Sequence, residues 1–305
     1  MILLDPMPDE IAAGYQGRLG ELHGWARQRK SLPELRRSNA AQGLDAGGAS
    51  PLHQLASAAR MPVTAFARLH TLLPVVNVAS DFGAGVPHGS GASGKGSHHG
   101  MRGIGGRPRV CRECIQEDIN HWGFSWYRRA HQIQGFDWCD KHGCGLLWVD
   151  SFDAFCASPH AWLASDTCRE SEEVWATASG APPLLHRYSA ACAAFLDRDA
   201  PAPSGLLNAT LRHRVSIHDL NLDRLQARVE DLAPASWLAR TFPDLSSFSS
   251  FGPTPIGRLL RRSGYAAAGY HYALLIALLW ERVDEALCEL FERPIAAPPI
   301  AVRIR

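Results

Sequence analysis

Lysine is nearly absent from the sequence. Of its 31 basic residues only Lys30, Lys95 and Lys141 are lysines, and the formal net charge is +1. A chain so close to neutral is not a polycation made for nonspecific nucleic-acid binding. The excess of arginine suits bidentate contacts to phosphate and carboxylate groups, and it is equally what a genome rich in G and C encodes.

Several other features are missing as well. The first ten residues contain two prolines and three acidic groups, which interrupt any signal-like apolar run. The uncharged window at residues 263–280 is broken by glycine, tyrosine and histidine, so it predicts a buried helix rather than a membrane span. We find no H-E-x-x-H, G-x-S-x-G or P-loop motif. These absences predict a cytoplasmic protein that is not an enzyme and has no membrane partner.

Cysteine is present in pairs. Cys111-x-x-Cys114 is followed after 24 residues by Cys139-x-x-His142. In a reducing compartment, two short chelating pairs predict a metal site rather than disulfides. Three thiolates and one imidazole suit a single closed, structural Zn²⁺ site. Incidental buried cysteines and an iron–sulfur cluster are the alternatives, and a second metal held by some of Cys144, Cys156, His160 and Cys168 is not favoured.

Residues 52–69 can be aligned with a helix-turn-helix. Apolar residues occupy the template's core positions, Ala56 is small where the helices cross, and Arg60 replaces the usual turn glycine. The second helix would then enter the major groove, with Thr64, Arg68 and His70 as contact residues. An ordinary helical hairpin is the alternative. The apolar template positions are Leu55, Ala59, Met61, Phe66 and Leu69.

Three segments resemble the TniQ/TnsD family, whose members select targets for transposons. They are residues 108–118 (PRVCRECIQED), 126–133 (WYRRAHQI) and 139–146 (CDKHGCGL). Residues 8–10, 17–19 and 70–74 resemble the family's N-terminal motifs. The chain departs from the family at Arg112, where a proline is common, and it has no second CxxC knuckle.

The resemblance implies a non-catalytic adaptor for target selection. Such a protein binds target DNA or a CRISPR guide-RNA complex and recruits a AAA+ transposition regulator, and a homodimer is a further possible partner. The other readings are a zinc-ribbon DNA- or RNA-binding regulator unrelated to transposition and, less favoured, a zinc hydrolase or nuclease. Arg128 and Arg129 could grip nucleic-acid phosphates, or they could stabilise the zinc module by pairing with Glu117 or Asp118.

The chain as a whole predicts a mainly α-helical fold in five segments. Residues 1–80 are expected to form a helical domain that contains the helix-turn-helix-like unit, with a boundary or a first-turn position at Pro33. Residues 81–107 are expected to form a flexible Gly/Ser-rich loop whose histidines (His88, His98 and His99) are solvated. Residues 108–150 form the zinc-ribbon module, 151–183 an acidic connection and 184–305 a helical domain whose final long helix spans 269–291.

Overall fold

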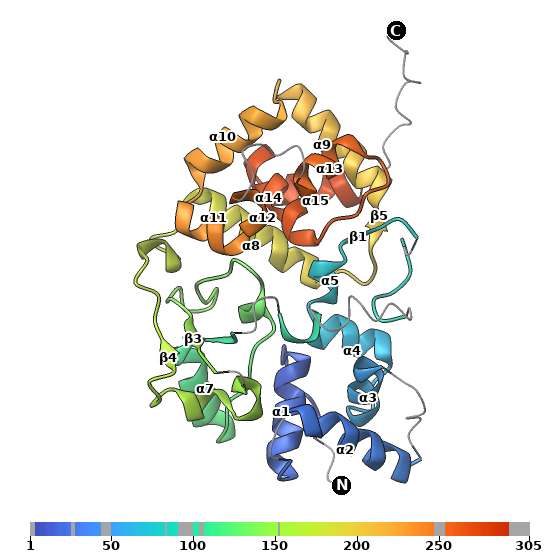
Figure 1. The fold of residues 1–305 in the computed structure, drawn as a ribbon, viewed down its shortest axis with the longest axis vertical. Helices are drawn as coiled ribbons and strands as arrows, with labels where there is room; N and C mark the ends of the chain where they lie inside the picture. Colours follow the sequence, from blue (N-terminus) through green and yellow to red (C-terminus); the bar gives the residue numbers. More distant parts are fainter. Residues whose placement is uncertain are drawn as a thin grey trace.

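The structure is a computed structural model that describes residues 4–25, 28–43, 50–82, 84–90, 100–103, 107–151, 153–246 and 254–292. His98 and His99 lie outside these described residues. The fold is mainly α-helical, as predicted, with short strands in the Cys-rich segment (Figure 1). In the described part of the chain, no helix combines the length and the apolar character needed to cross a membrane.

The N-terminal helices are α1 (Ala12–Leu22), α2 (Gln28–Ala41), α3 (Pro51–Ala58), α4 (Val63–His70) and α5 (Leu73–Val76). Their apolar faces form a core of their own that includes Tyr15, Leu55 and Phe66. The boundary expected at Pro33 was wrong, because this proline lies inside α2. Gly17 allows close contact between α1 and the backbone at Phe155, because a Cβ on Gly17 would lie 1.5 Å from the carbonyl oxygen of Phe155.

The Cys-rich segment contains a three-stranded antiparallel sheet. Its strands are β2 (Arg109–Val110), β3 (Leu147–Val149) and β4 (Cys168–Arg169), in the order β2-β3-β4. The longest helix of the segment, α7 (Arg112–Trp122), follows β2 directly. The segment also contains short 3-10 helices, which are η1 (Ala130–Gln132), η2 (Ala154–Cys156), η3 (Pro159–Trp162) and η4 (Val174–Ala176).

The C-terminal helices surround a packed pair, α8 (Pro183–Leu196) and α14 (Gly269–Leu279). Around it lie α9 (Ser204–Ile217), α10 (Leu222–Leu232), α11 (Ala235–Thr241), α12 (Pro243–Ser246), α13 (Pro255–Arg261), α15 (Val283–Leu287) and the π-helix η5 (Cys288–Glu292). The single helix expected over 269–291 is divided, because Trp280 is extended and ends α14. Its indole N–H donates to Glu289, so the chain turns back upon itself.

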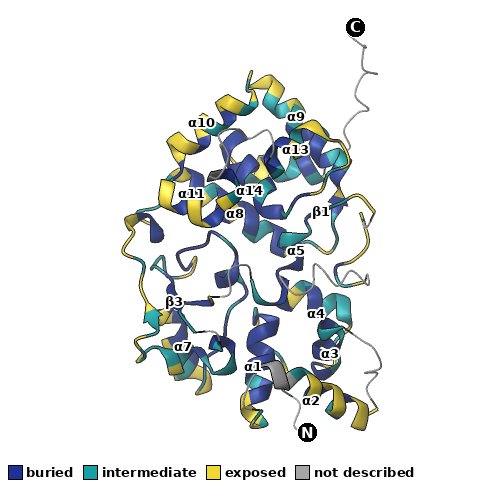
Figure 2. Cartoon of the chain, in the orientation of Figure 1, coloured by how far each residue is buried: buried dark blue, intermediate teal, exposed yellow. Residues whose placement is uncertain are grey.

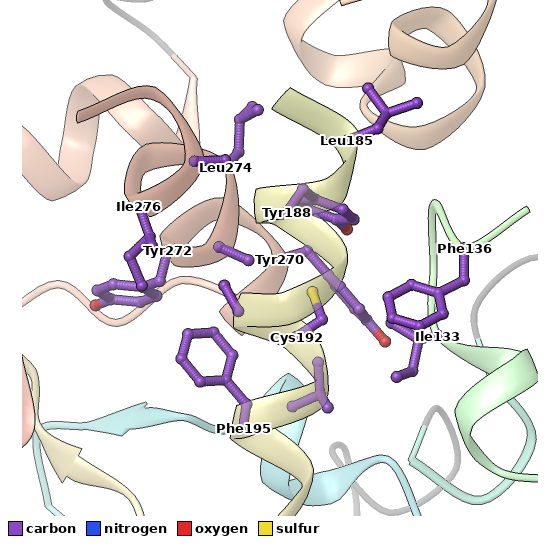
Figure 3. Close-up of a cluster of buried hydrophobic side chains, with 14 of the residues drawn as sticks. Ile133, Phe136, Leu185, Tyr188, Cys192, Phe195, Tyr270, Tyr272, Leu274 and Ile276 are labelled. Carbon is purple, nitrogen blue, oxygen red and sulfur yellow. The ribbon is translucent and has the colours of Figure 1, made fainter. Parts of the chain in front are cut away.

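One hydrophobic core joins the Cys-rich segment to the C-terminal helices. Figure 3 shows Ile133 and Phe136 packed against α8 and α14, and the buried inner faces are dark in Figure 2. Gly135 allows this approach: its φ is +80°, and a Cβ there would lie 2.8 Å from Thr241. The parallel pair β1 (Ala79–Ser80) and β5 (Ala202–Pro203) connects the N-terminal part to α9.

Candidate functional site

Four ligand atoms converge in the Cys-rich segment. The Nδ1 atom of His142 lies 3.4 Å from the Sγ atoms of Cys111 and Cys114 and 3.5 Å from that of Cys139. The Sγ atoms of Cys114 and Cys139 are 3.6 Å apart. A tetrahedron with Zn–S bonds of about 2.3 Å and a Zn–N bond of about 2.05 Å has S···N edges of roughly 3.6 Å and S···S edges of roughly 3.8 Å. The four donors therefore have the spacing of one tetrahedral ion.

Local backbone structure positions each pair. Cys111 is the N-cap of α7, and its Sγ accepts a hydrogen bond from the Cys114 backbone N–H at 3.4 Å. The first pair thus lies at the start of a helix. The second pair lies on a turn, closed by Gly143 at φ +69°, whose N–H donates to the Cys139 carbonyl at 2.7 Å.

Glu117 supports His142 from outside the cluster. The Nε2 atom of His142 is 3.1 Å from Glu117 Oε1, and the ammonium of Lys141 donates to the other carboxylate oxygen. A carboxylate on the second ring nitrogen fixes which nitrogen faces the metal. Sequence reasoning missed this role, although Glu117 lies three residues after Cys114 and so shares its helix face.

The electrostatics of the cluster differ from donor to donor, because hydrogen bonds with Cys111 and Cys139 and burial raise the pKa of the Cys114 thiol. Hydrogen bonds from the thiols of Cys114 and Cys139 lower the pKa of Cys111. Burial opposes charge on His142, yet the Glu117 carboxylate and the neighbouring thiols raise its pKa to about 9. Binding of a metal ion displaces these protons, so affinity is coupled to pH.

Arg128 and His131 support the cluster from the interior. Arg128 makes a bidentate pair with Asp118, at 2.7 Å to each carboxylate oxygen, and lies 4.7 Å over the Trp126 ring. His131 is buried against Cys139, and burial lowers its pKa. Asp118 is also buried, so Arg128 has the structural partner that the sequence offered as the alternative to phosphate binding.

Arg129 connects the Cys-rich segment to the N-terminal helices. Its Nε donates to Asp9 at 2.9 Å, and its Nη1 donates to the carbonyl of Arg68 at the end of α4. The side chain is only 8% exposed, which favours the structural alternative over phosphate binding, although its acidic partner is Asp9 rather than Glu117 or Asp118. Cations at a helix C-terminus also complement its dipole.

The other N-terminal motif residues meet at the same junction. Glu10 is buried and accepts from Arg18 at 2.9 and 2.7 Å, and burial raises its pKa. The Trp126 indole donates to the Pro8 carbonyl at 3.0 Å. Segments that are more than a hundred residues apart in the sequence therefore form one polar network.

The α3–α4 unit has the expected turn. Arg60 has a φ of +54°, the left-handed conformation that a glycine usually adopts at this point. Ala56 and Phe66 are buried between the helices. The Met61 N–H donates to the carbonyl of Ala56 at 3.0 Å, so the two helices are joined by a compact four-residue turn.

Two side chains on α4 have the opposite exposure from that expected. His70 is 5% exposed, its ring is tilted against that of Phe66 with centroids 5.1 Å apart, and its Nδ1 bonds the Glu10 carbonyl at 2.9 Å. Leu69 is instead 40% exposed. The prediction that His70 contacts DNA is therefore corrected, because its imidazole faces the protein interior. Thr64 is half-buried, and Arg68 is 41% exposed in a 3.0 Å pair with Asp199.

The predicted loop at 81–107 covers part of α4. An added Cβ at Gly89 would lie 2.8 Å from the Ala67 Cβ. His88 is 4% exposed, so it is not a solvated linker histidine, and burial lowers its pKa to about 4. The face of α4 that carries Thr64, Arg68 and Leu69 is the part that stays accessible.

The residues considered for a second metal are separated. Cys144 Sγ lies 3.4 Å from Cys111 Sγ, at the edge of the first cluster, and the His160 ring bonds Ser125 at 3.1 Å. Within the described ranges, the one group of at least three metal-ligating side chains whose donor atoms all lie within 4.8 Å of one another comprises Cys111, Cys114, Cys139 and His142.

These features define a mainly α-helical protein with a Cys₃His cluster that could hold one metal ion and with a pair of short helices, α3 and α4, joined by a tight turn. Residues 1–146 match the TniQ family model, so this part of the chain is a TniQ domain. The family is associated with transposition and DNA targeting. The match includes α3, α4 and all four donors, and it ends before the C-terminal helices. No curated protein matches the chain.

Proposed function

We propose that this chain is a non-catalytic adaptor that selects the target of a TniQ-type transposition system. The observation that carries the proposal is the family match over residues 1–146, because it spans both the α3–α4 unit and the metal centre. The adaptor binds target DNA or a guide-RNA complex and recruits a AAA+ transposition regulator. A second copy of the chain is a further partner in this scheme.

We assign the Cys₃His centre to one Zn²⁺ ion. Three thiol sulfurs and one imidazole nitrogen at tetrahedral spacing are the donors that zinc prefers. The ion would cross-link the start of α7, which carries Cys111 and Cys114, to the turn that carries Cys139 and His142. A structural role agrees with the four protein ligands, which leave zinc no position for a substrate water.

The absence of catalysis is supported by the use of the nearby carboxylates. A hydrolase would need a free general base beside an open metal position. Glu117 is instead engaged by His142 and Lys141, and Asp118 by Arg128. Both acids thereby have structural partners.

DNA reading is assigned to the exposed face of α4. Thr64 and Arg68 lie on the second helix of the unit, and the left-handed Arg60 sets its angle to α3. Arg68 is held by the exposed carboxylate of Asp199, and an exposed pair contributes little to stability. It can therefore exchange this partner for a phosphate or a base.

The test measures DNA binding with and without the regulator. Labelled native-site and random duplexes are titrated at two salt concentrations, alone and with the cognate ATPase, and proteins bound in the native host are identified by pull-down. We expect weak binding to random duplex and a large gain from the native site or the ATPase. Equal binding to both duplexes with no ATPase recovered would overturn the proposal and favour an unrelated zinc-ribbon regulator, whereas metal-dependent nicking would favour a nuclease.

A further inference from the structure

A basic surface lies on α13 and the turn that follows it. Arg258, Arg261 and Arg262 are all exposed, and the sequence contains no Asp or Glu between Asp244 and Glu281. In the described part of the chain, neither Arg258 nor Arg262 forms an ion pair, whereas eleven other arginines do. We call these three residues the α13 arginine surface.

The backbone beneath this surface is held rigidly. Asn208 on α9 is fully buried, and its side-chain amide donates to the carbonyls of Arg262, Ser263 and Tyr265 at 3.1, 3.3 and 2.8 Å. Tyr272 donates in turn to the Asn208 Oδ1 atom at 3.0 Å. These bonds hold the backbone of Arg262 and of the turn that follows it, which reduces the backbone entropy lost when Arg262 binds a ligand.

The chemistry of the surface matches phosphate. The Arg258 guanidinium lies 5.8 Å from the centre of the Tyr265 ring, which orients it without neutralising it. Arg258 and Arg262 are one helical turn apart, about 6 Å along the axis, so they can contact successive anionic groups. Arg258 and Arg261 lie in the last turn of α13, where cations also complement the helix dipole.

One acidic side chain lies close to the turn. A Cβ placed on Gly264 would be 3.8 Å from Asp81 Oδ1. The same oxygen accepts a hydrogen bond from the Ser204 hydroxyl, so Asp81 connects the end of β1 to the start of α9. Asp81 keeps its negative charge, but three arginines against one carboxylate leave the surface net positive.

We propose that the α13 arginine surface binds the backbone phosphates of duplex DNA. It lies beside α9 at the opposite end of the molecule from α3 and α4 (Figure 1), and it lies beyond residues 1–146, which match the family model. The inference rests on the proposed DNA-targeting function, because DNA is then the polyanion that the chain meets. Contacts at both ends would fix the orientation of the protein on its target, while only α4 reads bases.

The test compares two double variants of the full zinc-loaded chain. Arg258→Ala with Arg262→Ala removes two contacts of the surface. Arg224→Ala with Arg282→Ala removes the same charge from exposed arginines that are paired with Asp219 and Asp284. Binding to random duplex is measured between about 25 and 150 mM salt, with thermal melting as the check on folding.

We expect the surface variant to reduce the slope of log K against log salt by about 1.8 and to weaken binding at about 0.1 M salt by roughly 60-fold, since each phosphate contact contributes about 0.9 to the slope. The control variant should change both quantities far less. Replacing the same two residues by lysine should retain most of the slope, because point charges remain.

Several results would overturn the inference while leaving the proposed function intact. One is a wild-type slope in the surface variant, and another is an equal loss in the control, which would indicate net charge alone. Loss of RNA or ATPase binding with duplex binding unchanged would assign the surface to another partner. If the wild-type chain binds no duplex with or without the ATPase, the inference and the DNA-binding part of the proposed function fail together.

Discussion

Removal of the Glu117 carboxylate should weaken metal binding without removing a ligand. The carboxylate is 3.1 Å from Nε2 of His142, while Nδ1 of the same ring faces the three thiols. Loss of such a partner lowers metal affinity by roughly 10- to 100-fold. Because Glu117 is 45% exposed, water can replace part of its hydrogen bond, so we expect the lower end of this range for Glu117→Ala.

Glu117→Gln should have a smaller effect than Glu117→Ala. The amide oxygen can still accept from the imidazole N–H and so retains its orientation, but the negative charge that raises the basicity of the ring is lost. The affinity for Zn²⁺ should therefore be highest in the wild type, lower in Glu117→Gln and lowest in Glu117→Ala. A chromogenic chelator competing for Zn²⁺ measures the three constants, and the Co²⁺ spectrum reports whether the three thiolates remain bound.

Two controls separate this effect from charge and from the neighbouring ion pair. Lys141→Met removes the other partner of Glu117 and leaves the contact to His142. Glu113→Gln removes an exposed acid from the first turn of the same helix. If both controls weaken zinc binding as much as Glu117→Ala does, the assignment of Glu117 as the partner that orients His142 is wrong.

Three further predictions follow from the same geometry. Cys114→Ser should abolish metal binding and expose residues 108–148 to proteolysis, because metal binding and folding are coupled; a folded, reduced wild-type protein without metal would contradict this. Phe66→Ala should destabilise the α3–α4 unit by about 3–5 kcal/mol. Arg68→Ala should instead weaken DNA binding and leave the melting temperature unchanged. If the DNA affinity of the Arg68→Ala variant is unchanged at low salt, α4 is not the helix that reads DNA. Burial lowers the pKa of His88 from 6.5 to about 4, so as the pH falls the unfolded chain binds a proton at this residue before the folded chain does. The free energy of unfolding should therefore fall by up to about 3 kcal/mol between pH 6.5 and 4. His88→Leu should remove this component in urea titrations at several pH values, and an equal loss in wild type and variant would show that other groups cause it.

The metal donors could be identified from the sequence because their chemistry is local. A CxxC or CxxH pair brings two ligands to one turn whatever the rest of the fold does, and the type of donor restricts the metal. The helical class was also predictable, since apolar periodicity and the positions of prolines reflect short-range geometry. The left-handed turn at Arg60 follows from the same local template, although an arginine stands where glycine is usual.

Only the tertiary structure decided which polar residues are available. His70 and Leu69 are neighbours on one helix, yet His70 is buried because the carbonyl of Glu10, sixty residues away, accepts its Nδ1–H. Arg128 and Arg129 are a basic pair beside aromatic residues in the sequence, and their partners Asp118 and Asp9 come from two different segments. Sequence patterns record which side chains are charged, but whether a charge is already neutralised depends on long-range packing, which is why the exposed arginines of α13 became visible as one surface only in the folded chain.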